Sequence, residues 1–223
     1  MMEPHEFWQE LHAPGSFPTE GTKVGFYPVT LDDGRQLRLP IRPLSDGAHA
    51  LASLIINQTS FEVLGVLADD LAAKLKVFEP DVVVGLPTLG LTLASEVARR
   101  LGHSRYVPLG TSRKFWYLDA LSVPMSSITT QQEKRLYADP RMLPLLQGRR
   151  VALIDDVISS GTSIVAGLSL LGASGIEPVV VGAAMLQSER WREALEKLDQ
   201  KWPPRVRTAF STPLLRKERE GWI

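Results

Sequence analysis

Cysteine is absent from the 223-residue chain. This absence excludes disulfide frameworks, thiolate metal sites and cysteine nucleophiles, and it is compatible with the cytoplasmic location that we expect. The chain also lacks an excess of charge of either sign, because 25 Lys and Arg residues balance 25 Asp and Glu residues. Without a global field to attract nucleic acid or an anionic membrane, any phosphate must be held by local geometry. We therefore expect neither nucleic acid nor a membrane as a partner.

Signals for secretion, membrane insertion and zinc binding are lacking too. Residues 1–10 contain acids and no positive region followed by an apolar one, so we expect no secretory signal. The longest uncharged stretch, residues 157–176, is interrupted by six Ser or Thr residues and four Gly residues, which favours a loop and a buried helix over a membrane span. The four histidines have no ligand spacing, so we expect no zinc site built by the protein.

The sequence has the composition of a folded protein and the alternating pattern of segments that is typical of an α/β protein. Hydrophobic residues make up 44% of the chain and charged residues 22%, close to globular averages. From Asp81 onwards, short apolar β-prone runs alternate with amphipathic helical segments. We predict the strands at residues 82–84, 105–109, 151–154, 179–185 and 206–210. This alternation predicts an α/β fold with a doubly wound, mainly parallel sheet that has helices on both faces.

The N-terminal part has a different pattern. Two β-like runs, 23–31 and 36–41, flank an Asp-Asp-Gly turn, so we predict a β-hairpin. Residues 48–56 are predicted to be helical, and a second helix is predicted from a capping box that starts at Thr59. In that second helix one face carries Leu64, Leu67, Leu71 and Leu75. We divide the chain into an N-terminal segment, 1–45, and a core, 46–223, that ends in a tail of about residues 195–223.

One long segment, residues 111–148, interrupts the core. It begins with Ser112-Arg113-Lys114-Phe115-Trp116-Tyr117 and contains one β-like piece at 122–129. Insertions longer than about 12 to 15 residues in a compact domain are usually functional or mobile, so we interpret the segment as a flexible loop that acts as a lid. The alternative is an edge hairpin with a surface helix around residues 131–138.

The chemistry is concentrated in residues 151–163, Val-Ala-Leu-Ile-Asp-Asp-Val-Ile-Ser-Ser-Gly-Thr-Ser. The predicted strand delivers Asp155 and Asp156 to its carboxyl end, where ligands of open α/β sheets bind. The following turn then opens a helix, and its backbone N–H groups and hydroxyls can converge on a phosphate. That turn comprises Ser159, Ser160, Gly161, Thr162 and Ser163. A phosphorylated sugar satisfies both parts, because carboxylates accept hydrogen bonds from its hydroxyls directly or through Mg²⁺.

These 13 residues resemble the phosphoribosyl pyrophosphate signature of type I phosphoribosyltransferases. The Walker and dinucleotide-binding glycine motifs are absent from the sequence. The resemblance covers about residues 45–190 and implies a core with a small N-terminal hood over the base and a flexible loop. It also implies a pyrophosphate-binding turn and a basic pair in the flexible loop, here Arg113 and Lys114. The residues of that turn are Pro87, Thr88, Leu89 and Gly90, although the usual pair of glycines is missing there.

The resemblance implies Mg²⁺-dependent transfer of a phosphoribosyl group from phosphoribosyl pyrophosphate to a nucleobase, with release of pyrophosphate. Asp155 and Asp156 would bind Mg²⁺ and the ribose, and Arg113 and Lys114 would neutralise the leaving group. The likeness is greatest to adenine and xanthine enzymes, so we expect a purine substrate and a homodimer. Trp191 is our candidate for stacking on the base, with packing in the core as its alternative.

Two other functions remain open from the sequence. One is an orotate-type phosphoribosyltransferase, and the other is a non-catalytic regulator that senses phosphoribosyl pyrophosphate. The acid pair is also superficially similar to that of phospho-accepting receiver domains. In those domains the pair follows the first strand, whereas here it follows the third core strand and leads directly into the hydroxyl-rich turn.

Overall fold

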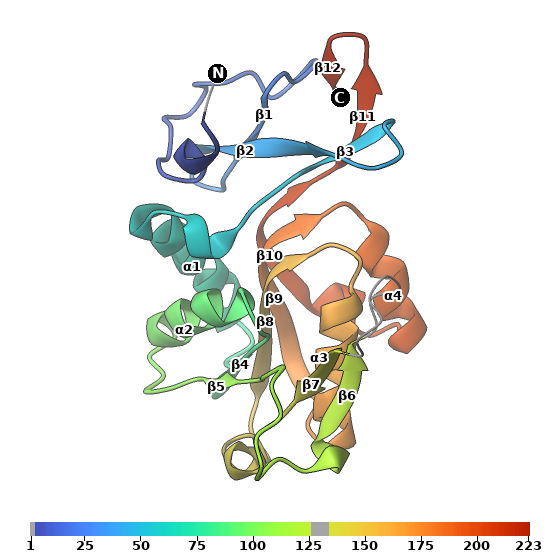
Figure 1. The fold of residues 1–223 in the computed structure, drawn as a ribbon. Helices are drawn as coiled ribbons and strands as arrows, with labels where there is room; N and C mark the ends of the chain where they lie inside the picture. The colour runs from blue at the N-terminus through green and yellow to red at the C-terminus, as the bar shows by residue number, and fades with distance from the viewer. Residues whose placement is uncertain (1–2, 126–133) are drawn as a thin grey trace.

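The computed structural model describes residues 3–125 and 134–223. Two five-stranded sheets organise these residues, with the antiparallel sheet above the parallel one in Figure 1. The parallel sheet has the order β10-β9-β8-β4-β5. Its strands, in chain order, are β4 (Val82–Gly85), β5 (Val107–Pro108), β8 (Val151–Ile158), β9 (Pro178–Gln187) and β10 (Val206–Thr212). All four pairings in it are parallel, which confirms the predicted fold class.

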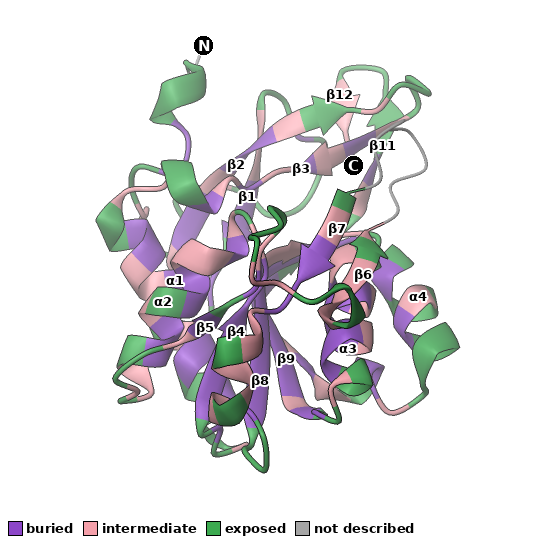
Figure 2. Cartoon of the chain, turned by 60° about the horizontal axis from the view of Figure 1, so that its bottom comes forward, coloured by how far each residue is buried: buried purple, intermediate pink, exposed green. Residues whose placement is uncertain are grey.

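Helices cover both faces of the parallel sheet, as predicted. In β8, Ala152 and Ile154 belong to one apolar cluster and Val151 and Leu153 to another, because side chains alternate between the two faces of a strand. The helices α1 and α2 pack on the first cluster, and α3 and α4 on the second. Figure 2 shows the strands between them as almost entirely buried. The bounds of these helices are α1 (Phe61–Lys76), α2 (Gly90–Arg100), α3 (Thr162–Ala173) and α4 (Arg190–Leu198).

Helix α1 illustrates how closely the sequence pattern sets the local structure. Its cap is Ser60, one residue after the predicted Thr59, and the Ser60 hydroxyl accepts a hydrogen bond from the Val63 N–H at 3.2 Å. The predicted apolar face is buried as expected, at Leu64, Leu67, Leu71 and Leu75. No helix within residues 3–125 and 134–223 is long and apolar enough to cross a membrane.

The antiparallel sheet joins segments from distant parts of the sequence. Its order is β1-β2-β3-β11-β12, and the predicted hairpin forms β1 and β2. The predicted helix over residues 48–56 is wrong: β3 lies there, hydrogen-bonded to β2 on one side and β11 on the other, followed by the 3-10 turn η2 (Ile56–Gln58). The strands are β1 (Phe26–Thr30), β2 (Gln36–Pro43), β3 (His49–Ala52), β11 (Leu214–Glu218) and β12 (Gly221–Trp222). This sheet therefore extends beyond the predicted boundary at residue 45.

The long insertion contains a short hairpin that packs on α3. The hairpin pairs β6 (Ser122–Met125) with β7 (Lys134–Tyr137), preceded by η3 (Asp119–Leu121) and followed by η4 (Pro140–Leu145). The edge-hairpin alternative thus describes residues 122–125 and 134–137. A surface helix is wrong for residues 134–137, because they pair with β6, and residues 126–133 lie outside the described part. Two further 3-10 turns are η1 (Pro4–Glu6) and η5 (Pro203–Arg205).

Candidate active site

The acid pair lies inside a strand that is longer than predicted. Strand β8 continues past Asp155 to Ile158, because its pairing with β9 continues through Ile158, opposite Leu186. On the other side, β4 ends at Gly85, opposite Ile154. From Asp155 onwards, β8 therefore has no paired strand on this side. The chain that leaves β4 turns there and passes this edge of β8.

That turn, residues 86–90, packs directly against the acid pair. A Cβ atom added to Gly90 would lie 2.8 Å from Asp155 Oδ1 and 2.9 Å from Asp155 Cα, so a larger residue does not fit without a shift. Gly90 is also the first residue of α2, and the peptide bond between Pro87 and Thr88 is cis. The structure thus brings the predicted Pro87, Thr88, Leu89 and Gly90 turn next to Asp155. Its contact with pyrophosphate stays a prediction.

The two carboxyl groups are held in an environment that disfavours their charge. Asp155 is 6% exposed, and its Oδ1 accepts a hydrogen bond from the Asp156 N–H at 2.9 Å. Burial raises the pKa of Asp155 well above its usual range, and the negative charge of Asp156 raises it further. Burial also raises the pKa of Asp156. Among the described residues no Lys, Arg or His forms an ion pair with either group, so the pair would gain from a cation or from hydroxyl donors supplied by a ligand.

The turn after β8 forms a small pocket at the start of α3. The pocket has a volume of about 100 Å³ and is lined by Asp155 and by residues 157–164. At ~30 Å³ per water molecule, this is room for about three waters or one phosphoryl group. Ser160 and Thr162 share a hydrogen bond of 2.9 Å between their hydroxyls, and the first N–H groups of α3 have no partner within the helix. The predicted set Ser159, Ser160, Gly161, Thr162 and Ser163 is therefore brought together at an anion-compatible position.

Gly161 is required by both its conformation and its surroundings. Its φ of +83° lies in the left-handed region, and an added Cβ would lie 3.1 Å from Ala194 Cβ and 3.2 Å from the Trp191 carbonyl oxygen. The turn thus rests on the first part of α4. Trp191 itself is 2% exposed and lies with Leu195 in the apolar cluster under α3 and α4. A ring this buried offers no open face for stacking, so the packing alternative describes Trp191 and we do not propose it as a base contact.

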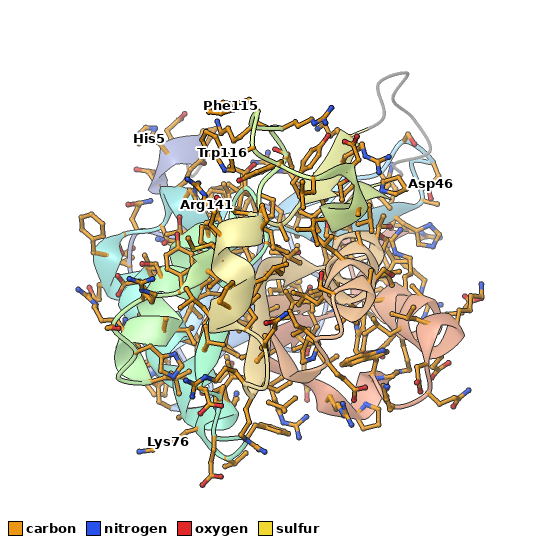
Figure 3. All side chains as sticks on the ribbon, turned by 90° about the horizontal axis from the view of Figure 1, so that it is seen from below. His5, Asp46, Lys76, Phe115, Trp116 and Arg141 are labelled. Atoms are coloured by element: carbon orange, nitrogen blue, oxygen red, sulfur yellow. The ribbon has the colours of Figure 1, made fainter. Side chains whose placement is uncertain are left out.

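The basic pair of the insertion is not joined to the acid pair. Arg113 forms an ion pair of 3.0 Å with Asp119 of the same segment, and within the described residues no hydrogen bond or ion pair links Arg113 or Lys114 to the sheet edge. The segment is fixed instead by Trp116, whose ring lies 4.3 Å under the Arg141 guanidinium (Figure 3). The role of Arg113 and Lys114 toward a leaving group stays a prediction.

One residue that the sequence did not single out reaches the phosphate-sized pocket. Arg190, the first residue of α4, places Nη2 at 3.1 Å from the Ser159 hydroxyl. Its Nε donates to the Ser188 hydroxyl at 3.3 Å. The sequence places Arg190 three residues after β9, a strand adjacent to β8, and thus at the same carboxyl edge of the sheet, but it does not indicate the contact with Ser159.

The chain matches one protein family over most of its length. Residues 55–209, well over half of the sequence, match the model described as the phosphoribosyl transferase domain. The chain belongs to this family. The matched range contains the parallel sheet up to the middle of β10, the acid pair and the pocket, whereas β1, β2, β3, β11 and β12 lie outside it.

Curated proteins that are similar to this chain at low identity are named phosphoribosyltransferases as well. A hypoxanthine/guanine phosphoribosyltransferase of Methanosarcina acetivorans is 26% identical over 137 residues, which cover 61% of this chain and 64% of that protein. An adenine phosphoribosyltransferase of Gluconobacter oxydans is 28% identical over 129 residues, covering 58% and 68%. The chain thus spans 64% of the length of the first of these curated relatives, a little less than two thirds, and 68% of the second.

A solved structure supports the fold. The adenine phosphoribosyltransferase of Giardia lamblia, solved with 9-deazaadenine, superposes with a TM-score of 0.58 at 18% identity, over 84% of this chain and 93% of that one. At this identity the likeness shows the fold alone. It confirms the type I phosphoribosyltransferase fold that the sequence predicts.

Proposed function

We propose that this protein transfers the phosphoribosyl group of phosphoribosyl pyrophosphate to a nucleobase and releases pyrophosphate. The observation that carries the proposal is the juxtaposition of the 100 Å³ pocket at residues 157–164 with Asp155 at the carboxyl edge of β8. A sugar phosphate is the ligand class that combines an anion for such a pocket with hydroxyl donors for carboxylates. Membership in the phosphoribosyl transferase domain family supports the same reaction.

The residues present fit a Mg²⁺ ion that is bound together with the substrate. Two carboxyl groups, Asp155 and Asp156, lie side by side with raised pKa values and no paired cation among the described residues, and bound Mg²⁺ would relieve their repulsion. No group of three or more His, Cys, Asp or Glu side chains could hold a metal alone in the described part of the chain. Mg²⁺ typically uses one or two carboxylates and completes its shell with water and substrate phosphates. When bound, it would neutralise charge on the diphosphate group.

The chain's own residues would act by position and charge. The turn 159–163 would hold the terminal phosphate, and the carboxylates of Asp155 and Asp156 would accept hydrogen bonds from the ribose 2′ and 3′ hydroxyls. As the base nitrogen approaches C1′ and the C1′–O bond breaks, positive charge grows on the ribose, and the two carboxylates stabilise it. Gly90 packs against Asp155, and the backbone at residues 87–90 would contact the departing pyrophosphate. Arg113 and Lys114 would have to approach from the insertion.

We further propose a purine as the acceptor base and a homodimer as the assembly. The purine is supported by the names of the two relatives given above, a hypoxanthine/guanine and an adenine phosphoribosyltransferase. An orotate phosphoribosyltransferase that is 25% identical over 124 residues is the reason to keep the orotate-type alternative in the test. The dimer is supported by Phe61, which is 92% exposed at the start of α1 beside a groove of about 600 Å³ between α1 and α2. Light scattering coupled to size exclusion would give a mass near 49 kDa for the dimer, twice the 24.7 kDa of the chain. Cytoplasmic location stays a prediction.

The decisive experiment measures pyrophosphate release from phosphoribosyl pyrophosphate and Mg²⁺ across adenine, guanine, hypoxanthine, xanthine, orotate and uracil. Release with a purine supports the proposal, and release with orotate alone supports the orotate-type alternative. Donor binding without release on any base supports a sensor. Asp156→Asn should lower turnover by roughly 100-fold or more while the protein stays folded, because it removes one of the two charges that stabilise the ribose. Unchanged turnover in that variant would remove Asp156 from the mechanism.

A further inference from the structure

A cation from another element contacts the lining of the phosphate-sized pocket. Residues 157–164, which line the pocket with Asp155, contain no Lys, Arg or His. Arg190 at the start of α4 reaches the pocket through Ser159, with 3.1 Å between Nη2 and Oγ. The contact crosses from α4 to the turn that opens α3.

Hydrogen bonds to neighbouring residues orient the Arg190 guanidinium toward Ser159. Its Nε donates to the hydroxyl of Ser188, which is 6% exposed. The Ser188 N–H donates in turn to the Thr212 carbonyl at 2.8 Å, so the last residue of β10 fixes the residue that orients the guanidinium. The chain Thr212, Ser188, Arg190, Ser159 thus connects the sheet edge to the turn.

The charge of Arg190 is not compensated by the protein. No ion pair joins Arg190 to a carboxylate in the described part of the chain, and its two hydrogen-bonded partners are neutral hydroxyls. The adjacent Glu189 is paired with Arg192 instead, at 3.0 Å. An arginine has five N–H donors in a planar fork, and the three that remain here have no partner among the described residues. A guanidinium that touches only hydroxyls at the rim of an anion pocket is suited to bind a phosphoryl oxygen.

We propose that Arg190 is a ligand of the terminal phosphate of the sugar phosphate bound in the turn 159–163. This inference rests on the proposed function and adds a residue to it. The phosphoryl group would accept one hydrogen bond from the Arg190 fork and the others from the turn. Because a phosphate monoester is a dianion above its second pKa of about 6, Arg190 would favour the dianion over the monoanion.

The test is calorimetric binding of ribose 5-phosphate to the full chain and to matched variants. Arg190→Gln should weaken binding about 10-fold or more, the range expected for loss of a hydrogen bond to a charged group. Arg192→Gln removes the same charge from the same helix, but Arg192 is paired with Glu189 and stacked 4.8 Å over the Trp191 ring, so binding should stay within about twofold. Arg190→Lys should recover part of the affinity, because it keeps the charge without the planar fork.

Two further readouts separate a phosphate ligand from a structural residue. Affinity of the wild-type protein for ribose 5-phosphate should rise between pH 5 and 7, and this rise should be smaller in Arg190→Gln. Affinity for inorganic pyrophosphate with Mg²⁺, and the melting temperature without ligand, should be the same in both proteins. Equal losses of ribose 5-phosphate and pyrophosphate binding would assign Arg190 a merely structural role and overturn the inference.

Failure of the proposed function and failure of the Arg190 role give different results. If the wild-type protein binds neither ribose 5-phosphate nor phosphoribosyl pyrophosphate, both the proposed function and the role of Arg190 are overturned. If the wild-type protein binds ribose 5-phosphate and the Arg190→Gln and Arg192→Gln variants bind it equally well, only the role of Arg190 is overturned.

Discussion

Replacing Asp155 by asparagine should make the protein more stable while it removes activity. The change keeps the shape of the side chain, and the amide oxygen of the variant can still accept the hydrogen bond that Asp155 Oδ1 accepts from the Asp156 N–H. The change removes the negative charge of a residue that is only 6% exposed and lies next to Asp156. Among the described residues this charge has no paired cation. A residue with this environment is retained for binding rather than for stability.

The sign and size follow from the raised pKa of Asp155. A carboxyl group whose folded pKa lies above its unfolded pKa of 3.8 binds a proton more tightly in the folded state. Stability therefore falls as pH rises from about 4, and the penalty levels off only once the pH has passed the folded pKa. A tenfold change in proton affinity corresponds to about 1.4 kcal/mol, and for a chain of this size each kcal/mol moves the melting temperature by roughly 2–4 °C. We expect Asp155→Asn to melt about 3 °C or more above wild type at pH 7.

Scanning calorimetry between pH 5 and 8, without ligand, measures this effect. Asp199→Asn is the control, because Asp199 is exposed and its pKa is lowered by Lys201, so its removal should give no gain. Addition of Mg²⁺ and phosphoribosyl pyrophosphate should stabilise wild type and leave the Asp155→Asn variant nearly unchanged. An Asp155→Asn protein that melts at or below wild type at pH 7 would refute the reasoning, since burial of the charge would then cost nothing.

Two other substitutions test parts of the fold that hold the site. Gly161→Ala should cost about 1–3 kcal/mol of unfolding free energy in urea, from the left-handed φ of +83° and the tight contacts with α4, whereas Gly172→Ala in α3, where an added Cβ meets open space, should be neutral or stabilising. Arg141 lowers the pKa of Asp139 to about 2, so this pair stabilises the fold at neutral pH and its contribution is lost as pH falls from 4 through 2. Asp139→Asn should lack that acid-dependent part of the stability when acid unfolding is followed by the tryptophan fluorescence of the protein. An acid transition identical to that of the wild type would contradict this prediction.

The core could be predicted from the sequence because its information is local. In residues 151–154 every side chain is apolar, which is typical of a strand covered on both faces, and this part of β8 is buried on both. The hairpin of β1 and β2 is equally local, since its turn residues lie between its strands. The prediction for segment 48–56 is wrong for the opposite reason. Its strand β3 is stabilised by β11, whose residue Leu215 pairs with Ala50, and nothing near Ala50 in the sequence signals that partner.

In the candidate site, too, the residues that are close in the sequence could be predicted and the contacts between distant residues could not. The acid pair and the turn 159–163 are contiguous, so their spacing alone predicts a phosphate next to hydroxyls, and the structure brings both together. The contact of Gly90 with Asp155 depends on where β4 ends relative to β8, which only the sheet register shows. Arg190 escapes prediction because its partner Ser159 lies 31 residues earlier, across α3 and β9. Trp191 is a stacking candidate by sequence because an aromatic residue at a strand end has the same pattern whether it is open or buried.

The position of β11 has a consequence for synthesis of the chain. Strand β3 is finished at Ala52, but the strand that covers its second edge begins only at Leu214. At translation rates of about 5–20 residues per second, the ribosome needs roughly 10–30 s to make the intervening segment. During that interval a nascent chain presents a bare β-edge, the kind of surface that joins neighbouring polypeptides. The antiparallel sheet is thus completed after all five strands of the parallel sheet have left the ribosome.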